Sequence, residues 1–332
     1  MVTANAARRL IEHYVDNFRR LPWRSPPGAL PPQPYAVWLS EVMLQQTTVA
    51  TVRPRFGRFL ARWPSIAALA AADDADILSE WAGLGYYARA RNLIACAREV
   101  DRRGGFPTTS AELAELPGIG AYTSAAIAAI AFGEKAPAVD TNVERVMVRV
   151  HALAKPSRRE VEGKLLELMD GQRPGDVAQA LMDLGATLCR PKRPRCGDCP
   201  LQSDCAAFAS GNPEAFPARR QRKVRPHRHG VAWWIERDGG VWLVRRPASG
   251  LLGGMAALPG GEWGEAPPAR DPVVSVRHVF THFSLDLAIE LRSEPVGEGW
   301  WHRIDSLPDA GLPTLYLKAA HEFMSRRRSL AA

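Results

Sequence analysis

Leu116-Pro117-Gly118-Ile119-Gly120-Ala121-Tyr122-Thr123 is the stretch that decides the fold of this chain. It predicts a hairpin that ends one helix, turns at two glycines and begins another helix. Because the first backbone N–H groups of a helix lack intrahelical partners, such a hairpin can bind a phosphate. A Gly-x-Gly turn alone indicates only the end of a helix. The preceding Leu-Pro, the small residues that follow and the stretch Val139-Asp140-Thr141-Asn142-Val143 favour phosphate binding.

Helical signals continue on both sides of the hairpin. From about Ala6 to Phe208, apolar residues recur at three- and four-residue spacing with turn signals between them, which predicts an all-helical region. Within it, apolar residues at helical spacing predict a helix over 36–51 with Glu41 among its apolar positions. The alanine-rich run 121–131 predicts a tightly packed helix.

The character of the chain changes near Gly211. Residues 212–229 are rich in arginine and lysine and poor in apolar residues, which predicts a basic linker, either a solvated tether or a strap that contacts phosphate. Beyond it, short β-prone runs and a helical pattern at 314–328 predict a mixed domain with an antiparallel sheet over 230–332. The β-prone runs are 231–235, 241–244 and 285–291.

Length and composition agree with this division. A chain of 332 residues exceeds what one core usually organises, so we expect two domains. The net charge of +8 suits a polyanionic partner, although an ordinary basic enzyme has such a charge too. No apolar run approaches the roughly 20 residues that cross a bilayer, so we expect no membrane association. Charged residues interrupt the first 20 positions, so we expect no signal peptide and a cytoplasmic protein.

Four of the five cysteines crowd into one short stretch. They are Cys189, Cys196, Cys199 and Cys205. In a reducing compartment this crowding indicates a metal site, either a four-cysteine iron–sulfur cluster or zinc. Zinc ribbons generally use two short Cys pairs far apart, whereas only one such pair is present here, so we favour a 4Fe–4S cluster. The loop 190–195 would present cations for phosphate or merely solvated charge, and Cys96 is expected to be a small core residue.

These features resemble a known superfamily. The hairpin, the downstream Asp140 and the cysteine spacing are similar to the helix-hairpin-helix DNA glycosylases with an iron–sulfur loop, which include endonuclease III. Segments 38–47 and 83–92 resemble, more narrowly, the adenine DNA glycosylases of the MutY type. The similarity begins near Leu21-Pro-Trp-Arg24 and resumes in the C-terminal domain.

The resemblance implies a multidomain fold. An all-α catalytic region over 1–211, made of helix-hairpin-helix and six-helix parts with the cluster loop 189–205, would be followed by an α+β Nudix-like domain over 230–332. The metal-binding acidic helix that pyrophosphate hydrolysis needs has the pattern Gly-x5-Glu-x7-Arg-Glu-x2-Glu-Glu, and no such stretch is present. This second domain should therefore bind its ligand without hydrolysing a pyrophosphate. Its segment Phe280-Thr281-His282 resembles the Phe-Ser-His loop with which the family reads 8-oxoguanine, with threonine in place of serine.

Two carboxylates would carry the chemistry. Cleaving adenine from its sugar requires protonation of a poor leaving group and stabilisation of a cationic sugar. Glu41, desolvated among apolar residues, would hold the proton, and ionised Asp140 would face the cation, electrostatically or as a transient nucleophile. Asp140 would also fit a plain helix N-cap, and Glu41 a surface carboxylate.

The residue after Gly120-Ala121 separates two mechanisms. In the endonuclease III type a lysine there forms a Schiff base and leads to strand cleavage. This sequence has Tyr122, so we expect a monofunctional hydrolase that leaves an abasic site, with Asn142 positioning Asp140 or water. A packing role for Tyr122 is the alternative.

The remaining site residues follow from the resemblance. Adenine must be flipped from the duplex into a pocket. The residues expected near the orphaned base, the 8-oxoguanine left unpaired when adenine is flipped, are Gln46, Thr47, Leu84 and Tyr86. Those expected near adenine are Arg24 and Gln179. Those expected at the phosphate are Gly118 and Gly120. Core packing is the alternative for Leu84 and Tyr86.

We therefore expect a base excision repair enzyme that acts as a monomer on double-stranded DNA with 8-oxoguanine:adenine or guanine:adenine mispairs, associated with the nucleoid through DNA. Two other functions stay open. One is an endonuclease III-like glycosylase and lyase for oxidised pyrimidines. The other is a non-catalytic iron–sulfur DNA-binding protein.

Overall fold

The computed structural model describes residues 4–81, 83–218, 225–247, 250–267, 272, 274–280 and 282–331. The chain divides into two compact units. Met1–Leu84 with Arg89–Arg220 form the first, and Gly85–Ala88 with Gln221–Ala332 form the second. None of the helices in the described ranges combines the length and apolar character needed to cross a membrane.

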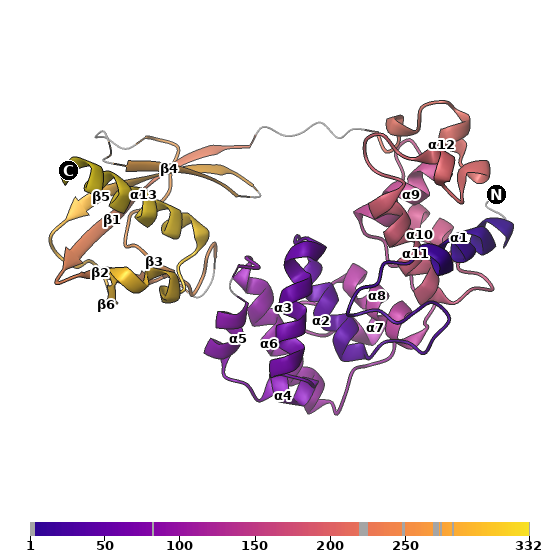
Figure 1. Cartoon of the computed structure of the whole chain (residues 1–332), viewed down its shortest axis with the longest axis horizontal. Helices are drawn as coiled ribbons and strands as arrows, with labels where there is room; N and C mark the ends of the chain where they lie inside the picture. Colours follow the sequence, from indigo (N-terminus) through magenta and orange to yellow (C-terminus); the bar gives the residue numbers. More distant parts are fainter. Residues whose placement is uncertain are drawn as a thin grey trace. The chain divides into compact units, whose positions relative to one another are not determined.

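The first unit is helical, as the sequence predicts (Figure 1). Its helices are α1 (Ala4–Asn17), α2 (Pro34–Leu44), α3 (Val49–Arg62), α4 (Ile66–Ala70), α5 (Asp74–Glu80), α6 (Tyr87–Arg102), α7 (Ser110–Leu113), α8 (Ala121–Phe132), α9 (Thr141–Val150), α10 (Arg158–Leu168), α11 (Pro174–Thr187) and α12 (Ala206–Ala209). Short 3-10 turns lie at Cys196–Asp198, Gln202–Asp204 and Pro213–Ala215.

The alanine-rich helix α8 is the centre of this unit. It packs against α2, α7 and α11, and residues 123–131 are all buried. Small side chains let the neighbouring helices approach closely. A Cβ atom added to Gly175 of α11 would lie 2.8 Å from the backbone oxygen of Ala129. This close packing fixes α2 and α11, which carry site residues, relative to the hairpin before α8.

The single helix predicted over 36–51 is wrong. Helix α2 ends at Leu44 and α3 begins at Val49. Between them Gln46 adopts a left-handed conformation with φ of 55°. The Thr48 hydroxyl then accepts a hydrogen bond from the backbone N–H of Thr51 and caps α3. Apolar spacing continues through the break because both helices bury a face, so periodicity alone does not reveal it.

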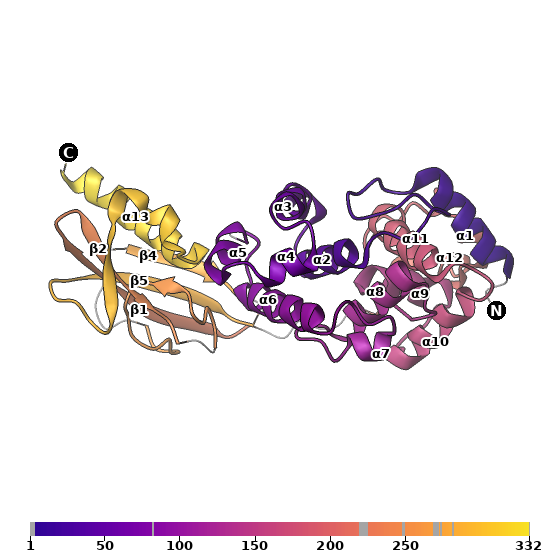
Figure 2. The same cartoon turned by 90° about the horizontal axis from the view of Figure 1, so that it is seen from below.

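The second unit is a six-stranded sheet with one long helix. Its elements are β1 (His227–Arg237), β2 (Gly240–Arg245), β3 (Ala256–Ala257), β4 (Val274–Val279), β5 (Ser284–Arg292), β6 (Gly299–Arg303), the 3-10 segment η4 (Ile304–Ala310) and α13 (Thr314–Ala331). The strand order is β3-β2-β1-β5-β4, and β6 pairs with β2. Figures 1 and 2 show α13 along one face of the sheet, where the Phe323 ring lies 4.9 Å from that of Trp234.

Two sequence expectations need correction in this unit. The sheet is mixed rather than antiparallel, because β1 and β5 pair in parallel. The alternation of apolar and polar residues along a strand indicates which residues are buried. It does not indicate whether the strand runs parallel or antiparallel to a partner that is distant in the sequence. Strand β1 also begins at His227, inside the predicted linker 212–229, because pairing with β5 from Ser284 onward extends it toward the N-terminus.

Candidate active site and metal centre

A cavity of about 850 Å³ opens in the helical unit. The cavity is lined by residues of the segment 19–24, α2, the turn that follows α2, the hairpin and α8, the segment 139–140 with the start of α9, the first residue of α10, and α11. Ten of the predicted site residues meet there: Arg24, Glu41, Gln46, Thr47, Gly118, Gly120, Tyr122, Asp140, Asn142 and Gln179. Residues spread over more than 150 positions of the sequence therefore share one space.

Glu41 is the buried acid of this cavity. Its side chain lies on α2 among buried apolar neighbours, and only 7% of the residue is exposed. The pKa of Glu41 is raised to about 7. Burial is the main cause and the charge of Asp140 adds to it, while a hydrogen bond from Tyr122 and the charge of Arg24 partly offset the increase. At neutral pH this carboxyl group therefore holds a proton in a large share of molecules.

Asp140 caps α9. Its Oδ1 atom accepts a hydrogen bond from the backbone N–H of Val143 at 2.7 Å, and its Oδ2 atom accepts one from Asn142 Nδ2 at 3.0 Å. The predicted N-cap geometry is present. The two bonds hold the carboxylate in one orientation at the positive end of the helix dipole.

Asn142 is itself held in place. Its Oδ1 atom accepts a hydrogen bond from Arg145 Nη2 at 2.9 Å, and Arg145 Nε donates to the backbone oxygen of Cys189 at 2.8 Å. A Cβ atom at Gly185 would lie 2.7 Å from Asn142 Cβ, so only glycine lets α11 pass this close. A chain of hydrogen bonds thus runs from Asp140 to the cysteine loop.

Arg24 reaches the cavity through an ion pair that the sequence analysis missed. Arg24 Nη1 donates to Asp183 Oδ2 at 2.7 Å, and both side chains are more than nine-tenths buried. The backbone N–H of Arg19 donates to the same oxygen at 3.1 Å. Asp183 stands among apolar residues of α11, as Glu41 does on α2, and that shared pattern could have revealed it.

Gln179 presents an unused acceptor. The residue is 5% exposed, its Nε2 atom donates to the backbone oxygen of Gly175 at 3.2 Å, and its Oε1 atom has no partner among the described residues. A buried acceptor without a partner costs about 1–3 kcal/mol. Since Gln179 lines the cavity, a bound molecule could supply the missing donor.

The hairpin and the turn after α2 also border the cavity. Gly118 has φ of 74°, and a Cβ atom there would lie 2.6 Å from Asn92 Cβ, so glycine is required on both counts. Gly120 is the N-cap residue of α8. Thr47 accepts a hydrogen bond from Arg89 Nη2 at 3.2 Å, which ties the turn to α6.

Leu84 and Tyr86 do not line this cavity. Leu84 is 5% exposed, which agrees with the packing alternative. Tyr86 is 51% exposed and has φ of 50°, a conformation that is strained for a tyrosine. Their proposed contacts with DNA stay predictions.

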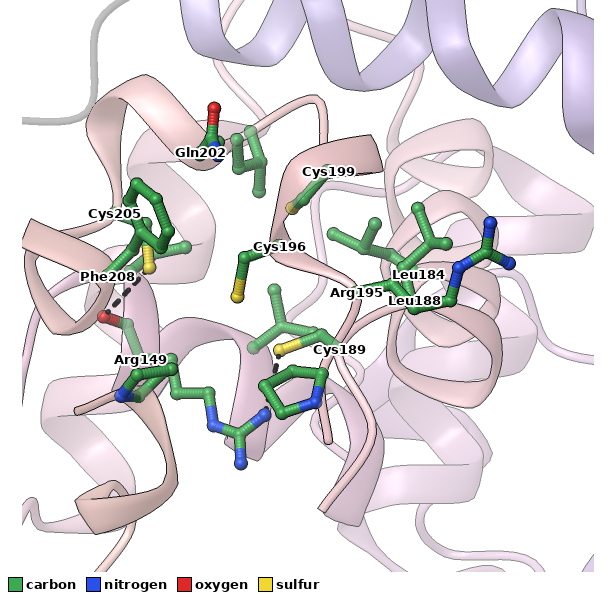
Figure 3. Close-up of a pocket in the computed structure, with 15 residues that line it drawn as sticks. Arg149, Leu184, Leu188, Cys189, Arg195, Cys196, Cys199, Gln202, Cys205 and Phe208 are labelled. Atoms are coloured by element: carbon green, nitrogen blue, oxygen red, sulfur yellow. Dashed lines mark hydrogen bonds between the residues drawn. The ribbon is translucent and has the colours of Figure 1, made fainter. Parts of the chain in front are cut away.

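The four clustered cysteines face one pocket. Figure 3 shows the sulfur atoms of Cys189, Cys196, Cys199 and Cys205 pointing toward a common space, and none of them forms a disulfide. Burial raises the pKa of Cys199 to about 12, and the other three sulfurs add to the increase. Four thiolates this close would repel one another without a bound cation, so the donor set fits a four-thiolate metal centre.

Arg149 fixes this loop to α9. Its buried guanidinium donates to the backbone oxygens of Arg190 at 2.7 Å and Pro191 at 3.1 Å, and Nη1 lies 3.4 Å from Cys189 Sγ (Figure 3). Cys96 is fully buried on α6, away from the four, as expected of a small core residue.

The predicted lesion-reading segment lies in the second unit, between β4 and β5. The Phe280 ring stacks on Trp263 at 5.7 Å, and its backbone N–H donates to the oxygen of Phe283 at 2.9 Å. His282 is exposed. Thr281 lies outside the described residues.

Comparisons with known proteins agree with both units. Residues 39–170 match the HhH-GPD superfamily of base excision DNA repair proteins, and residues 230–322 match the NUDIX domain. An adenine DNA glycosylase of Mycolicibacterium smegmatis is 40% identical over 219 residues, which cover 64% of this chain and 73% of that protein. The chain belongs to the adenine DNA glycosylase family.

A second member of the adenine DNA glycosylase family, from Homo sapiens, is 37% identical over 310 residues, which cover 76% of this chain. The match spans 57% of the human protein's length. Among solved structures, that of a thermostable thymine-DNA glycosylase superposes with a TM-score of 0.55 at 26% identity, covering 61% of this chain and 95% of its own. The resemblance to this family and the predicted fold class are confirmed.

Proposed function

We propose that this chain is a monofunctional DNA glycosylase that hydrolyses the N-glycosidic bond of adenine mispaired with 8-oxoguanine or guanine and leaves an abasic site. The observation that carries the proposal is the pairing of a buried acid, Glu41, whose pKa is about 7, with the capped carboxylate Asp140 in one cavity. Carboxyl groups in such different surroundings suit the roles of acid and charge stabiliser.

In the proposed reaction, protonated Glu41 gives its proton to a ring nitrogen of the flipped adenine. The bond between C1′ of the sugar and the base then breaks, and its electron pair leaves with the neutral base. Asp140 stabilises the cationic sugar, and a water molecule positioned by Asn142 adds to C1′ and loses a proton to a carboxylate. Removing adenine from the base stack costs a few kcal/mol, and a mispair lowers that cost.

Tyr122 supports hydrolysis without strand cleavage. A lyase needs an amine that forms an imine with the sugar, and the described residues lining the cavity include no lysine. The Tyr122 hydroxyl instead donates a hydrogen bond to Glu41. Arg24 and the Oε1 atom of Gln179, which has no partner in the described part of the chain, would border the adenine. The exocyclic amine of adenine would donate to that oxygen.

Double-stranded DNA is the proposed partner. Backbone N–H groups after Gly118 and Gly120 would bind a phosphate, and the basic loop 190–195 would bind another. Residues near the orphaned base would be Gln46, Thr47, Leu84 and Tyr86, and those that read 8-oxoguanine would be Phe280, Thr281 and His282. We further propose that the protein acts as a monomer at cytoplasmic DNA in the nucleoid.

The four cysteines are proposed to hold a 4Fe–4S cluster. When bound, the cluster would supply a rigid link between the residues flanking the loop 190–195 and thereby keep its cations in position for phosphate. Arg145 and Arg149 of α9 hold the start of this loop through the backbone oxygens of Cys189 and Arg190.

A cleavage assay tests the proposal. The protein is incubated with duplexes that carry adenine opposite 8-oxoguanine, guanine or thymine, and half of each sample is treated with hot alkali. We expect breaks only after alkali, and only in the first two duplexes. Strand breaks without alkali would indicate a lyase. If no strand breaks appear in any sample, with or without alkali, the protein would be a DNA-binding protein without catalysis. Glu41→Gln is the matched inactive control.

A further inference from the structure

We propose that His227, His229 and Asp286 bind a divalent transition-metal ion, Zn²⁺ being the best suited, on the C-terminal sheet. This site does not depend on the proposed function. One ligand atom from each residue lies within 4.8 Å of the other two. Two imidazoles and one carboxylate are donors that Zn²⁺ prefers, and water can complete a tetrahedral set.

The parallel pairing of β1 with β5 brings the three residues together. His227 lies opposite Ser284 and His229 lies opposite Asp286 in this register. Residues two apart on a strand point to the same face, so both imidazoles and the carboxylate share one side of the sheet. Leu285 and Leu287, on either side of Asp286, are buried in the core, so the three ligands face away from it.

The closest pair already has the spacing of metal ligands. His227 Nε2 lies 3.1 Å from Asp286 Oδ2. Two ligands at Zn–N and Zn–O distances of 2.0–2.2 Å in a tetrahedron are separated by about 3.4 Å. The His229 ring lies edge-on to that of His227, with centroids 4.7 Å apart. One ring nitrogen of His229 lies within 4.8 Å of the ligand atoms of both other residues.

The hydrogen bonds around His227 allow a metal to replace a proton. His227 Nδ1 lies 2.8 Å from Ser284 Oγ. In the tautomer of His227 that carries its hydrogen on Nε2, this hydrogen lies between the ring and Asp286, and the Ser284 hydroxyl donates to Nδ1. With a metal on Nε2, the proton moves to Nδ1 and Ser284 accepts it. No proton is gained or lost, and the outer nitrogen keeps the partner that ligating histidines usually have.

Arg277 completes the surroundings of Asp286. Its Nε atom donates to Oδ1 at 2.7 Å and its Nη2 atom to Oδ2 at 2.8 Å. Each carboxylate oxygen has two lone pairs, so Oδ2 can bind a metal and Arg277 together. The Arg277 side chain is 67% exposed, and solvent weakens its repulsion of the metal.

The site lies where the linker enters the sheet. His227 is the first residue of β1, and Ser284 pairs with Val279 at the base of the turn that contains Phe280 and His282. A bound metal would fix the start of β1 to the start of β5 beside this turn.

Titration of the full-length protein with ZnCl₂ by calorimetry tests the site, after removal of loosely bound metal and confirmation that iron and sulfide contents are unchanged. We expect one Zn²⁺ per chain. His229→Gln and Asp286→Asn should weaken binding more than about 100-fold, because even outer partners of a ligand contribute about 10- to 100-fold. Ser284→Ala, which keeps all three ligands, should weaken it about 10-fold.

His321→Gln is the matched control, since His321 is exposed on α13 of the same unit, and it should bind as the unchanged protein does. Zn²⁺ should also raise the Tm of the unchanged protein and of this control but not of His229→Gln. The proposal is overturned if the unchanged protein takes up no stoichiometric Zn²⁺, or if a folded His229→Gln variant binds it equally tightly.

Discussion

Asn142 Nδ2 donates a hydrogen bond to Asp140 Oδ2 at 3.0 Å, while its own Oδ1 atom accepts one from Arg145. The amide therefore sets the direction of the proposed catalytic carboxylate from within the same helix turn. The backbone bond from Val143 fixes the other oxygen.

We expect Asn142→Ala to slow base release about 10- to 100-fold, the effect of losing one hydrogen bond to a charged group. Single-turnover kinetics on an 8-oxoguanine:adenine duplex measures this rate. Binding of the same duplex should change little, because the backbone cap remains. A variant as fast as the unchanged protein would show that Asn142 does not position Asp140.

Glu41→Gln should reduce base release by at least about 100-fold, since it removes the proposed proton donor. Duplex affinity, measured by filter binding, should be retained. An active variant would exclude Glu41 as the acid. Asp183→Asn offers a contrast, because it weakens a buried ion pair and should lower stability as well as rate.

The same Glu41→Gln change should alter stability in a pH-dependent way. Folding raises the pKa of Glu41 from 4.5 to about 7, so the native state binds this proton more tightly than the unfolded chain. The resulting stability is complete below pH 4.5 and is lost as pH rises through 7. Above pH 8 the free energy of unfolding of the variant should exceed that of the unchanged protein by on the order of 3 kcal/mol. Urea unfolding of the full chain, followed through the helical signal, measures it.

Tyr122→Phe should move the alkaline limb of the pH–rate profile upward. Base release requires protonated Glu41 and should fall as pH rises above about 7. The Tyr122 hydroxyl lowers the pKa of Glu41, so its removal should raise that pKa. Profiles of single-turnover rate from pH 5 to 9 test this. A limb that moves to lower pH would contradict the proposed hydrogen bond.

Gln179→Leu should stabilise the free protein while slowing base release. The buried Oε1 atom has no partner among the described residues, so replacing the amide removes an unsatisfied group worth about 1–3 kcal/mol. Thermal unfolding and glycosylase assays measure the two effects. A variant that loses stability would indicate that Gln179 acts mainly in packing.

Cysteine substitutions separate the metal centre from the core. The purified protein should contain about four iron and four sulfide per chain. Cys199→Ser should lose most of both, whereas Cys96→Ala, at a buried position outside the pocket, should retain them. Stoichiometric zinc without iron in the unchanged protein would overturn the cluster assignment.

The sequence by itself determined the local features of this protein. The glycines of the hairpin, the apolar spacing around Glu41, the N-cap at Asp140 and the cysteine spacing each depend on neighbours within a few positions. These features therefore leave a readable pattern in the chain. The family resemblance added the roles of residues such as Gln179.

Only the tertiary structure decided the relationships between distant residues. The ion pair of Arg24 with Asp183 joins positions 159 residues apart, and the parallel pairing of β1 with β5 brings His229 beside Asp286. Such contacts depend on which buried faces pack together, and many sequences satisfy the same local pattern with different partners. The segment predicted as one helix over 36–51 is likewise two helices, α2 and α3. Apolar spacing alone does not reveal the break, because both helices bury residues in the core.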